Sequence, residues 1–286
     1  MPELPEVETI RNELAPLVVG RSIVGVTLSD PTALASPDQQ EFMARVVGKR
    51  VRSLRRRGKY LLFGLSSGRV LIVHLRMTGS LLLVPSGFPG PHVRQNTRVR
   101  LALKLDDGSG LLFIDRRRLG RVWLADVNGK HELMARLGME PLDPAFTPDD
   151  LSEALSRRRA PVKAVLCDQK VIAGVGNMYA DEALFEAGVH PLTAACEVPP
   201  EAVKRLHRSI RRVLRAAISN RGASVDTYLR PDGSPGQAHS EFRVAHRLGE
   251  PCPACGTEVE RIMIRNRGAY FCPRCQPRKG GRGSGV

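Results

Sequence analysis

Two pairs of cysteines near the C-terminal end have the spacing of a metal site. Cys252 and Cys255 form one Cys-x-x-Cys pair, Cys272 and Cys275 form a second, and sixteen residues separate the pairs. Four thiolates on two tight turns complete the tetrahedral shell of a structural zinc ion and leave no position for water or substrate. In a reducing compartment this pattern favours zinc over two disulfides. We therefore predict one Zn2+ that stabilises a finger and takes no part in catalysis.

The first residues offer a second kind of chemistry. Pro2 follows Met1, and an initiator methionine is normally removed before so small a residue, which would leave Pro2 as a free secondary amine. An α-amino group has a pKa of about 8, so a useful fraction is neutral at neutral pH and can attack an electrophilic carbon. The resulting iminium is an electron sink, and Glu3 could move the proton that elimination releases. On these residues alone, a coil that leads into a capped helix is the better-supported interpretation.

Basic residues dominate the charge of the chain. Lys and Arg number 44 against 29 Asp and Glu, which gives a net charge of +15 and a pI of about 10.3. Seven of the eleven residues at 49–59 are basic and none is acidic, while Arg265 and Arg267 fall between the cysteine pairs, where a hairpin tip could meet phosphate. A polyanionic partner such as nucleic acid fits this excess, and a solvated basic surface is the alternative.

The periodicity predicts an α+β protein. Apolar residues recur at helical spacing over 5–18, and segments rich in β-forming residues fill 21–125, which predicts a leading helix and then a sandwich or barrel of antiparallel strands. The predicted strands are 22–28, 51–65, 69–75, 79–84, 97–105, 110–114 and 121–124, and a long loop is expected at 85–96. The predicted helices beyond the strands are 151–159, 177–189 and 201–222, with a loop at 221–247.

The sequence shows no sign of a membrane protein. No stretch approaches the ~18 uninterrupted apolar residues that a membrane span needs. The acidic start lacks the basic and apolar regions of a signal peptide. We therefore expect a cytoplasmic protein with no membrane partner.

The motifs together resemble one family, the bacterial formamidopyrimidine-DNA glycosylases, also called 8-oxoguanine DNA glycosylases. The resemblance runs from residue 1 to about 276 and rests on the start MPELPEVETI, Gly58-Lys59-Tyr60, HLRMTG at 74–79, the Asp-Arg-Arg segment at 115–117, GVGNMYADEALF at 174–185 and the finger. Leu4 favours the branch that acts on oxidised purines, because enzymes similar to endonuclease VIII usually begin MPEGPE.

The resemblance implies a fold of two main parts. We expect a catalytic β-sandwich at 1–130, a linker at 131–147, a helix–two-turn–helix DNA-binding domain at 148–240, a C4 zinc finger at 241–276 and a disordered basic tail at 277–286. Damaged duplex DNA would lie between the two main domains, and a monomer at the bacterial nucleoid is expected.

The resemblance also implies a role for each motif residue. The catalytic group is Pro2 as the nucleophile that forms a Schiff base at C1′, Glu3 as general acid and base, Glu6 as a supporting carboxylate and Lys59 as the contact to the phosphate beside the lesion. The DNA-binding group is His74, Met77, Arg117, Leu119, Lys163, Asn177 and Arg267. Within it, His74, Asn177 and Arg267 would bind phosphates, Met77 would fill the space of the flipped nucleotide, and Arg117 would read the orphaned base.

Taken singly, several of these residues have a plainer interpretation. Met77 and His74 would be interior residues, and Asn177 an ordinary helix cap. The chain departs from the family pattern at Leu119, where a phenylalanine wedge is usual, and at Arg116, where a proline is common. Two alternatives stay open: an enzyme that prefers oxidised pyrimidines, and a non-catalytic protein that grips phosphates.

Overall fold

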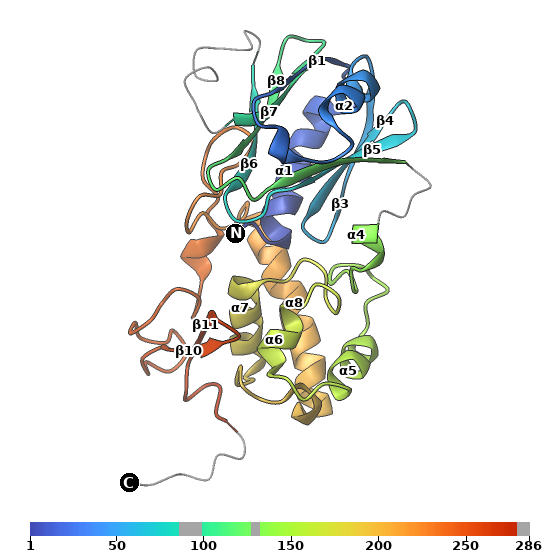
Figure 1. The fold of residues 1–286 in the computed structure, drawn as a ribbon. Helices are drawn as coiled ribbons and strands as arrows, with labels where there is room; N and C mark the ends of the chain where they lie inside the picture. The colour runs from blue at the N-terminus through green and yellow to red at the C-terminus, as the bar shows by residue number, and fades with distance from the viewer. Residues whose placement is uncertain (86–98, 127–131, 279–286) are drawn as a thin grey trace. The chain divides into compact units, whose positions relative to one another are not determined.

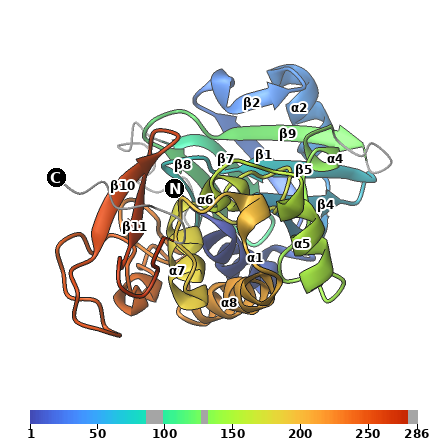
Figure 2. The same ribbon diagram turned by 90° about the horizontal axis from the view of Figure 1, so that it is seen from below.

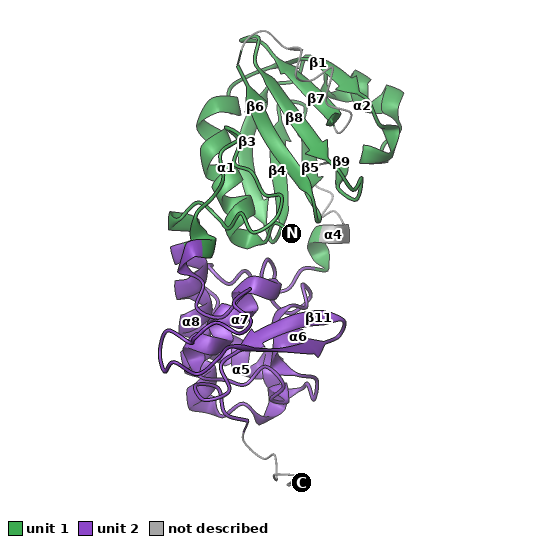
Figure 3. Ribbon diagram, turned by 90° about the vertical axis from the view of Figure 1, so that its left-hand side faces the viewer, with its two compact units in different colours: residues 1–136, 217–239 green, residues 137–216, 240–286 purple. Residues whose placement is uncertain are grey.

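The computed structural model describes residues 1–85, 99–126 and 132–278 of the chain. These residues form two compact units, coloured separately in Figure 3. One unit is Met1–Arg136 with Ala217–His239, and the other is Leu137–Ala216 with Ser240–Val286. Each unit is described by itself.

The first unit is built on two β-sheets (Figure 1). One sheet has the strand order β1-β7-β8-β6, and the other has the order β2-β9-β5-β4-β3. Every pairing is antiparallel except that of β2 with β9, which is parallel. The strands are β1 Ile23–Leu28, β2 Leu34–Ser36, β3 Val51–Arg57, β4 Tyr60–Leu65, β5 Arg69–His74, β6 Gly79–Val84, β7 Val99–Leu105, β8 Gly110–Asp115 and β9 Arg121–Asp126.

One apolar core joins the two sheets to the first helix, α1 Leu4–Val18. Val7, Ile10 and Leu14 of α1 are fully buried and belong to the same cluster as alternate residues of both sheets. Alternation arises because successive side chains of a strand point to opposite faces, so only every second residue enters the core. The α+β class, the leading helix and the sandwich strands are confirmed, except that the single strand predicted at 51–65 is wrong. It is a hairpin of β3 and β4, because Gly58, with a φ of +55°, and Lys59 turn the chain back.

The second unit is helical and ends in a β-hairpin. The capping box of Thr147 and Asp150 begins α5, and Gly188 in the left-handed conformation ends α7. The helices are α5 Pro148–Ser156, α6 Val162–Leu166, α7 Asn177–Ala187 and α8 Pro200–Ser219, whose last residues belong to the first unit. The hairpin strands β10 Glu260–Ile264 and β11 Arg267–Phe271 lie beside α7 in both Figure 1 and Figure 2.

Several short elements escape the sequence prediction. These are β2, the helix α2 Gln39–Val46, α6, the helix α4 Glu132–Ala135 inside the predicted linker, and the 3-10 turns at Pro31–Ala33, Ala195–Glu197 and Ala238–Glu241. They are too short for a periodic pattern: α2, for example, buries only Phe42 and Val46.

One further difference concerns a boundary between the predicted domains. The segment 217–239, predicted to lie within the helical domain at 148–240, clusters with the sandwich. The predicted loop at 85–96 and the tail at 277–286 lie mostly outside the described residues. In the part of the chain that the structure describes, no helix is long and apolar enough to cross a membrane.

Candidate active site and nucleic-acid interface

The start of α1 buries two carboxylates beside Pro2. Pro2 is buried, Glu3 occupies the N-cap position, and Glu6 lies in the first turn. Glu6 Oε2 accepts from the backbone N–H of Glu3 at 2.7 Å, while Oε1 accepts from the N–H of Ala223 at 2.8 Å. Both oxygens of Glu6 therefore bind backbone donors, and this carboxylate fixes the backbone that carries Pro2 and Glu3.

The segment 217–239 packs closely against this helix start. Gly222 has a φ of +78°, and a Cβ at this position would come within 3.0 Å of Glu6 Cγ. The buried Tyr228 donates from its hydroxyl to the carbonyl of Arg221 at 3.2 Å, and burial together with the Glu6 charge raises its pKa. Arg230 binds Glu13 of α1 with Nη2 to Oε1 at 2.8 Å. The first part of the loop predicted at 221–247 thus belongs to the first unit and packs against α1.

Lys59 and His74 lie at one end of neighbouring strands of one sheet. Lys59 ends the turn from β3 into β4, and His74 is the last residue of β5, paired in register with Tyr60. The rings of His74 and Tyr60 meet edge to face, with 4.4 Å between their centroids. Burial, Arg76 and Lys59 lower the pKa of His74 to about 3. His74 is therefore neutral.

The hydrogen bond of His74 decides which nitrogen carries its proton. Nδ1 accepts from the N–H of Arg76 at 3.0 Å. The proton therefore lies on Nε2, which can donate to an anion.

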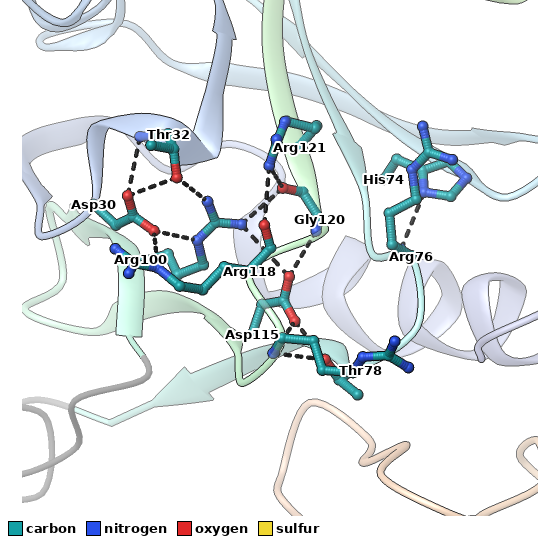
Figure 4. Close-up of polar contacts among 11 residues, drawn as sticks. Asp30, Thr32, His74, Arg76, Thr78, Arg100, Asp115, Arg118, Gly120 and Arg121 are labelled. Carbon is teal, nitrogen blue, oxygen red and sulfur yellow. Dashed lines mark hydrogen bonds and ion pairs between the residues drawn. The ribbon is translucent and has the colours of Figure 1, made fainter.

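The predicted wedge residues stand on two loops of the first unit. Met77 follows β5 and Leu119 follows β8, and they are 37% and 41% exposed, which is unusual for large apolar side chains. Arg117 is exposed on the same loop as Leu119, and its backbone N–H donates to Thr78 Oγ1 at 3.1 Å. The two loops are therefore hydrogen-bonded to each other through Thr78, which is labelled in Figure 4.

In the second unit, Lys163, Asn177 and Arg267 line one pocket of about 220 Å³. Asn177 is the first residue of α7, where backbone N–H groups are available to an anion. Its Nδ2 donates to the carbonyl of Gly268 at 2.9 Å, and Lys163 Nζ donates to the same oxygen at 2.8 Å. These bonds attach the hairpin to the start of α7 and leave the side chain of Arg267 exposed.

Lys163 occupies a more interior place than its predicted role in DNA binding suggests. Its side chain is 2% exposed and its Nζ lies 2.7 Å from Asp181 Oδ1. Burial raises the pKa of Asp181, and the Lys163 charge partly offsets this rise. Lys163 thus stabilises a buried carboxylate and the hairpin, and its direct contact with DNA stays a prediction.

The four cysteines of the finger come together in the second unit. Their sulfur atoms all lie within 4.8 Å of one another, with Cys252 and Cys275 at 3.9 Å and Cys255 and Cys272 at 3.4 Å. Four zinc–sulfur bonds of about 2.3 Å in a tetrahedron require sulfur separations of about 3.8 Å. The thiolates therefore fit one structural zinc ion, as predicted.

The sequence prediction overlooked the residues that hold the wedge loops. These are Thr78, Asp115, Arg100 and Asp30, all at least nine-tenths buried. Arg100 occupies a polar position in the alternation of β7 and would be expected at the surface. The local pattern contains no signal for its burial.

Models of protein families match most of the chain. Residues 1–122 match the formamidopyrimidine-DNA glycosylase N-terminal domain, residues 137–228 match the H2TH domain of the same enzymes, and residues 249–278 match the zinc finger found in FPG and IleRS.

Individual relatives agree with the family models. The formamidopyrimidine-DNA glycosylase of Chloroflexus aurantiacus is 45% identical over 96% of this chain and 98% of its own length. The crystal structure of the MutM (Fpg) protein of Thermus thermophilus matches with a TM-score of 0.85 and 41% identity, over 96% of this chain and 98% of that one. Structures of Lactococcus lactis Fpg with DNA containing an abasic site, a Fapy-dG or an oxidised pyrimidine match with a TM-score of 0.88 and 32% identity, over at least 96% of this chain and 100% of theirs.

The sandwich, the H2TH region and the four-cysteine finger together define a DNA-repair enzyme of the glycosylase class. The chain belongs to the formamidopyrimidine-DNA glycosylase family.

Proposed function

We propose that this protein excises oxidised purines, namely 8-oxoguanine and formamidopyrimidines, from duplex DNA and then cleaves the strand at the abasic site. The observation that carries the proposal is the start of α1, where Pro2 and Glu3 are buried on a backbone that Glu6 fixes. A nucleophile held in one place reacts faster because less orientational freedom is lost in the transition state.

The chemistry starts at the amine of Pro2 after Met1 is removed. Its lone pair attacks C1′ of the flipped nucleotide, the glycosidic bond breaks, and the base leaves with the proton of the amine. The C1′–O4′ bond then breaks, O4′ takes up a proton, and the nitrogen lone pair forms the iminium at C1′. The iminium then draws electrons from the C2′–H bond, so that the 3′ phosphate leaves by β-elimination and the 5′ phosphate by δ-elimination. Glu3 is the proposed carrier of the protons in these steps.

The remaining site residues would bind the DNA. Lys59 and the Nε2–H of His74 suit phosphates, because one is a cation and the other a neutral donor. Asn177 and Arg267 suit phosphates from the second unit. Met77 and Leu119 would fill the space of the extruded base, and Arg117 would read its former partner. We expect one copy of the chain to act on duplex DNA at the nucleoid.

Borohydride trapping tests the Schiff base directly. The protein is incubated with a duplex that contains one 8-oxoguanine opposite cytosine, and the covalent complex is located by peptide mass. We expect an adduct on Pro2 with Met1 absent.

Pro2→Gly should lower base excision by about a hundredfold or more. Pro5→Ala is the matched control, since it removes a proline from the first turn of α1 without changing the terminal amine, and it should still be trapped. Full excision by Pro2→Gly would overturn the mechanism.

A second substrate class deserves the same assay. The Lactococcus lactis relative was solved with DNA that contains an oxidised pyrimidine, so rates on single oxidised purines and pyrimidines decide the preference of this chain. Salt-dependent binding without excision of any of these lesions would favour a non-catalytic DNA-binding protein.

A further inference from the structure

The two wedge loops share a buried hydrogen-bond junction. Thr78, the neighbour of Met77, donates from Oγ1 to Asp115 Oδ1 at 2.5 Å and accepts from the N–H of Arg117 at 3.1 Å. Asp115 Oδ2 accepts from the N–H of Gly120 at 2.6 Å. One hydroxyl and one carboxylate therefore connect the loop of Met77 to both ends of the loop that carries Arg117 and Leu119 (Figure 4).

Arg100 lies behind this junction and extends it. Its Nη1 donates to the carbonyl of Gly120 at 2.8 Å and lies 3.5 Å from Asp115 Oδ2. Its Nε donates to Asp30 Oδ2 at 2.9 Å, and its Nη2 donates to Thr32 Oγ1 at 2.9 Å. Arg100 is 2% exposed, Asp30 5% and Asp115 fully buried. A buried charged network with its hydrogen bonds made favours one conformation, because any other leaves charges without partners.

Arg118, which is exposed, joins the buried network at Asp30. It has a φ of +57°, and its Nε donates to Asp30 Oδ2 at 2.8 Å. Two guanidinium groups thus offset two carboxylates. Burial alone would raise the pKa of Asp30, but hydrogen bonds from Arg118, Thr32 and Arg100 outweigh burial and hold this pKa well below its usual range. The carboxylate of Asp30 is therefore charged at neutral pH and forms an ion pair with the guanidinium of Arg118.

We propose that Asp30, Arg100 and Asp115, with Thr78 as the link, are positioning residues that hold Met77, Arg117 and Leu119 in one fixed arrangement for base extrusion. The inference rests on the proposed function, because it assumes that these three side chains enter the DNA. Close packing supports it: a Cβ on Gly79, next to Thr78, would come within 2.3 Å of the carbonyl oxygen of Leu75, so the loop has little room for another conformation. Side chains that are already held in one arrangement lose less conformational entropy when they enter the DNA.

Thr78→Val and Thr78→Ser form the matched pair that tests the network. Valine keeps the shape and removes the hydroxyl, whereas serine keeps the hydroxyl. We expect Thr78→Val to lower the rate constant for excising 8-oxoguanine by about tenfold, since a lost buried hydrogen bond costs about this factor. Cleavage at a preformed abasic site, where no base has to be extruded, should stay within about twofold, and Thr78→Ser should resemble the wild type in both assays.

A fluorescence readout separates positioning from general damage to the fold. The DNA carries 2-aminopurine beside the lesion, and the fluorescence of this base rises when it unstacks. With Thr78→Val this fluorescence should rise more slowly after binding than with the wild type, because the base unstacks more slowly. If this variant does not fold, as judged by its melting curve, Arg118→Ala makes the same comparison with an exposed side chain and should lower excision by about threefold. Equal effects on both substrates, or no effect on either, would overturn the inference. The proposed function fails separately, if the wild-type protein is not trapped on abasic DNA.

Discussion

Surroundings decide what each titratable residue of this protein can do. Glu6, predicted as a supporting carboxylate, has both oxygens engaged with backbone N–H groups. Lys163, predicted in the DNA-binding group, has its ammonium between Asp181 and the carbonyl of Gly268. His74 is neutral because burial and the two cations near it all oppose its protonation. On the surface, the same residue types would be solvated and would titrate near their usual pKa values.

The lowered pKa of His74 predicts a pH dependence of stability. The unfolded chain takes up a proton near the usual pKa of 6.5, whereas folded His74 takes it up only at about 3. Between these values the unfolded state binds more protons, so the free energy of unfolding falls as the pH is lowered, by up to about 1.4 kcal/mol per pH unit. This contribution is constant above about pH 7.

Denaturant unfolding between pH 7 and pH 5 measures this effect. His74→Asn keeps an acceptor near Nδ1 but does not titrate, so its stability should fall less than that of the wild type over this range. An imidazole NMR signal of His74 that titrates near pH 6.5 would contradict the prediction.

At the scale of elements, the segment 217–239 depends on close backbone packing. The carbonyl oxygen of Gly222 lies 2.2 Å from where a Cβ on Gly236 would stand, so the two ends of the segment meet at glycines. Glu6 binds the next residue, Ala223. A segment that looks like a plain loop in the sequence is therefore held to α1 by a few positions that admit no side chain.

Gly222→Ala should disturb this packing. The new Cβ would come within 2.9 Å of Tyr228 Cε1 and 3.0 Å of Glu6 Cγ, and the φ of +78° adds strain. Gly233→Ala is the control, because its φ is +84° but nothing lies within 4 Å of the new Cβ. Left-handed strain costs each variant about 1–2 kcal/mol, and the clash should add a further 1–3 kcal/mol or so at Gly222 alone.

Chemical unfolding and base excision, measured on both variants, check this expectation. Gly222→Ala should also excise more slowly than Gly233→Ala, since a displaced Glu6 shifts the backbone of Pro2 and Glu3. Equal stability and equal excision for the two variants would refute the argument.

For the whole molecule, two units of different construction are stabilised differently. The first has a large apolar core shared by two sheets and α1. The finger has a small core, in which Phe185, Val244 and Val259 pack with Cys252 and Cys272. Small cores seldom suffice without a metal or a disulfide, so zinc should supply most of the stability of the finger.

Removal of zinc should therefore unfold the finger and spare the sandwich. With a chelator, or in Cys272→Ser, the full-length protein should lose its one zinc ion, and hydrogen exchange should become fast over 249–278. The strands β4 and β5 should keep their protection, because their core contains no zinc ligand. DNA binding should weaken with a smaller salt dependence, as Arg267 is no longer held. Unchanged protection of 249–278 in a zinc-free protein would disprove the structural role.

Much of this protein follows from its sequence, because the features concerned are local. Segments rich in β-forming residues predicted the sandwich strands, and helical spacing of apolar residues predicted α1. The helices α5, α7 and α8 were also predicted, and the cysteine spacing predicted the zinc site. Motif residues such as Pro2, Lys59 and Asn177 could be named as candidates from their order along the chain.

Only the tertiary structure decided which partners these residues meet. Glu6 binds Ala223, 217 residues away, Lys163 binds Gly268, 105 residues away, and Arg100 binds Asp30, 70 residues away. Local sequence patterns cannot predict contacts between residues so far apart in the chain. The alternation of β7 places Arg100 on the face opposite the apolar core, and only the folded structure shows that this face is covered there. Because burial and charge pairing arise when distant segments pack together, the neutral His74, the interior Lys163 and the network behind the wedge loops emerge only from the folded chain.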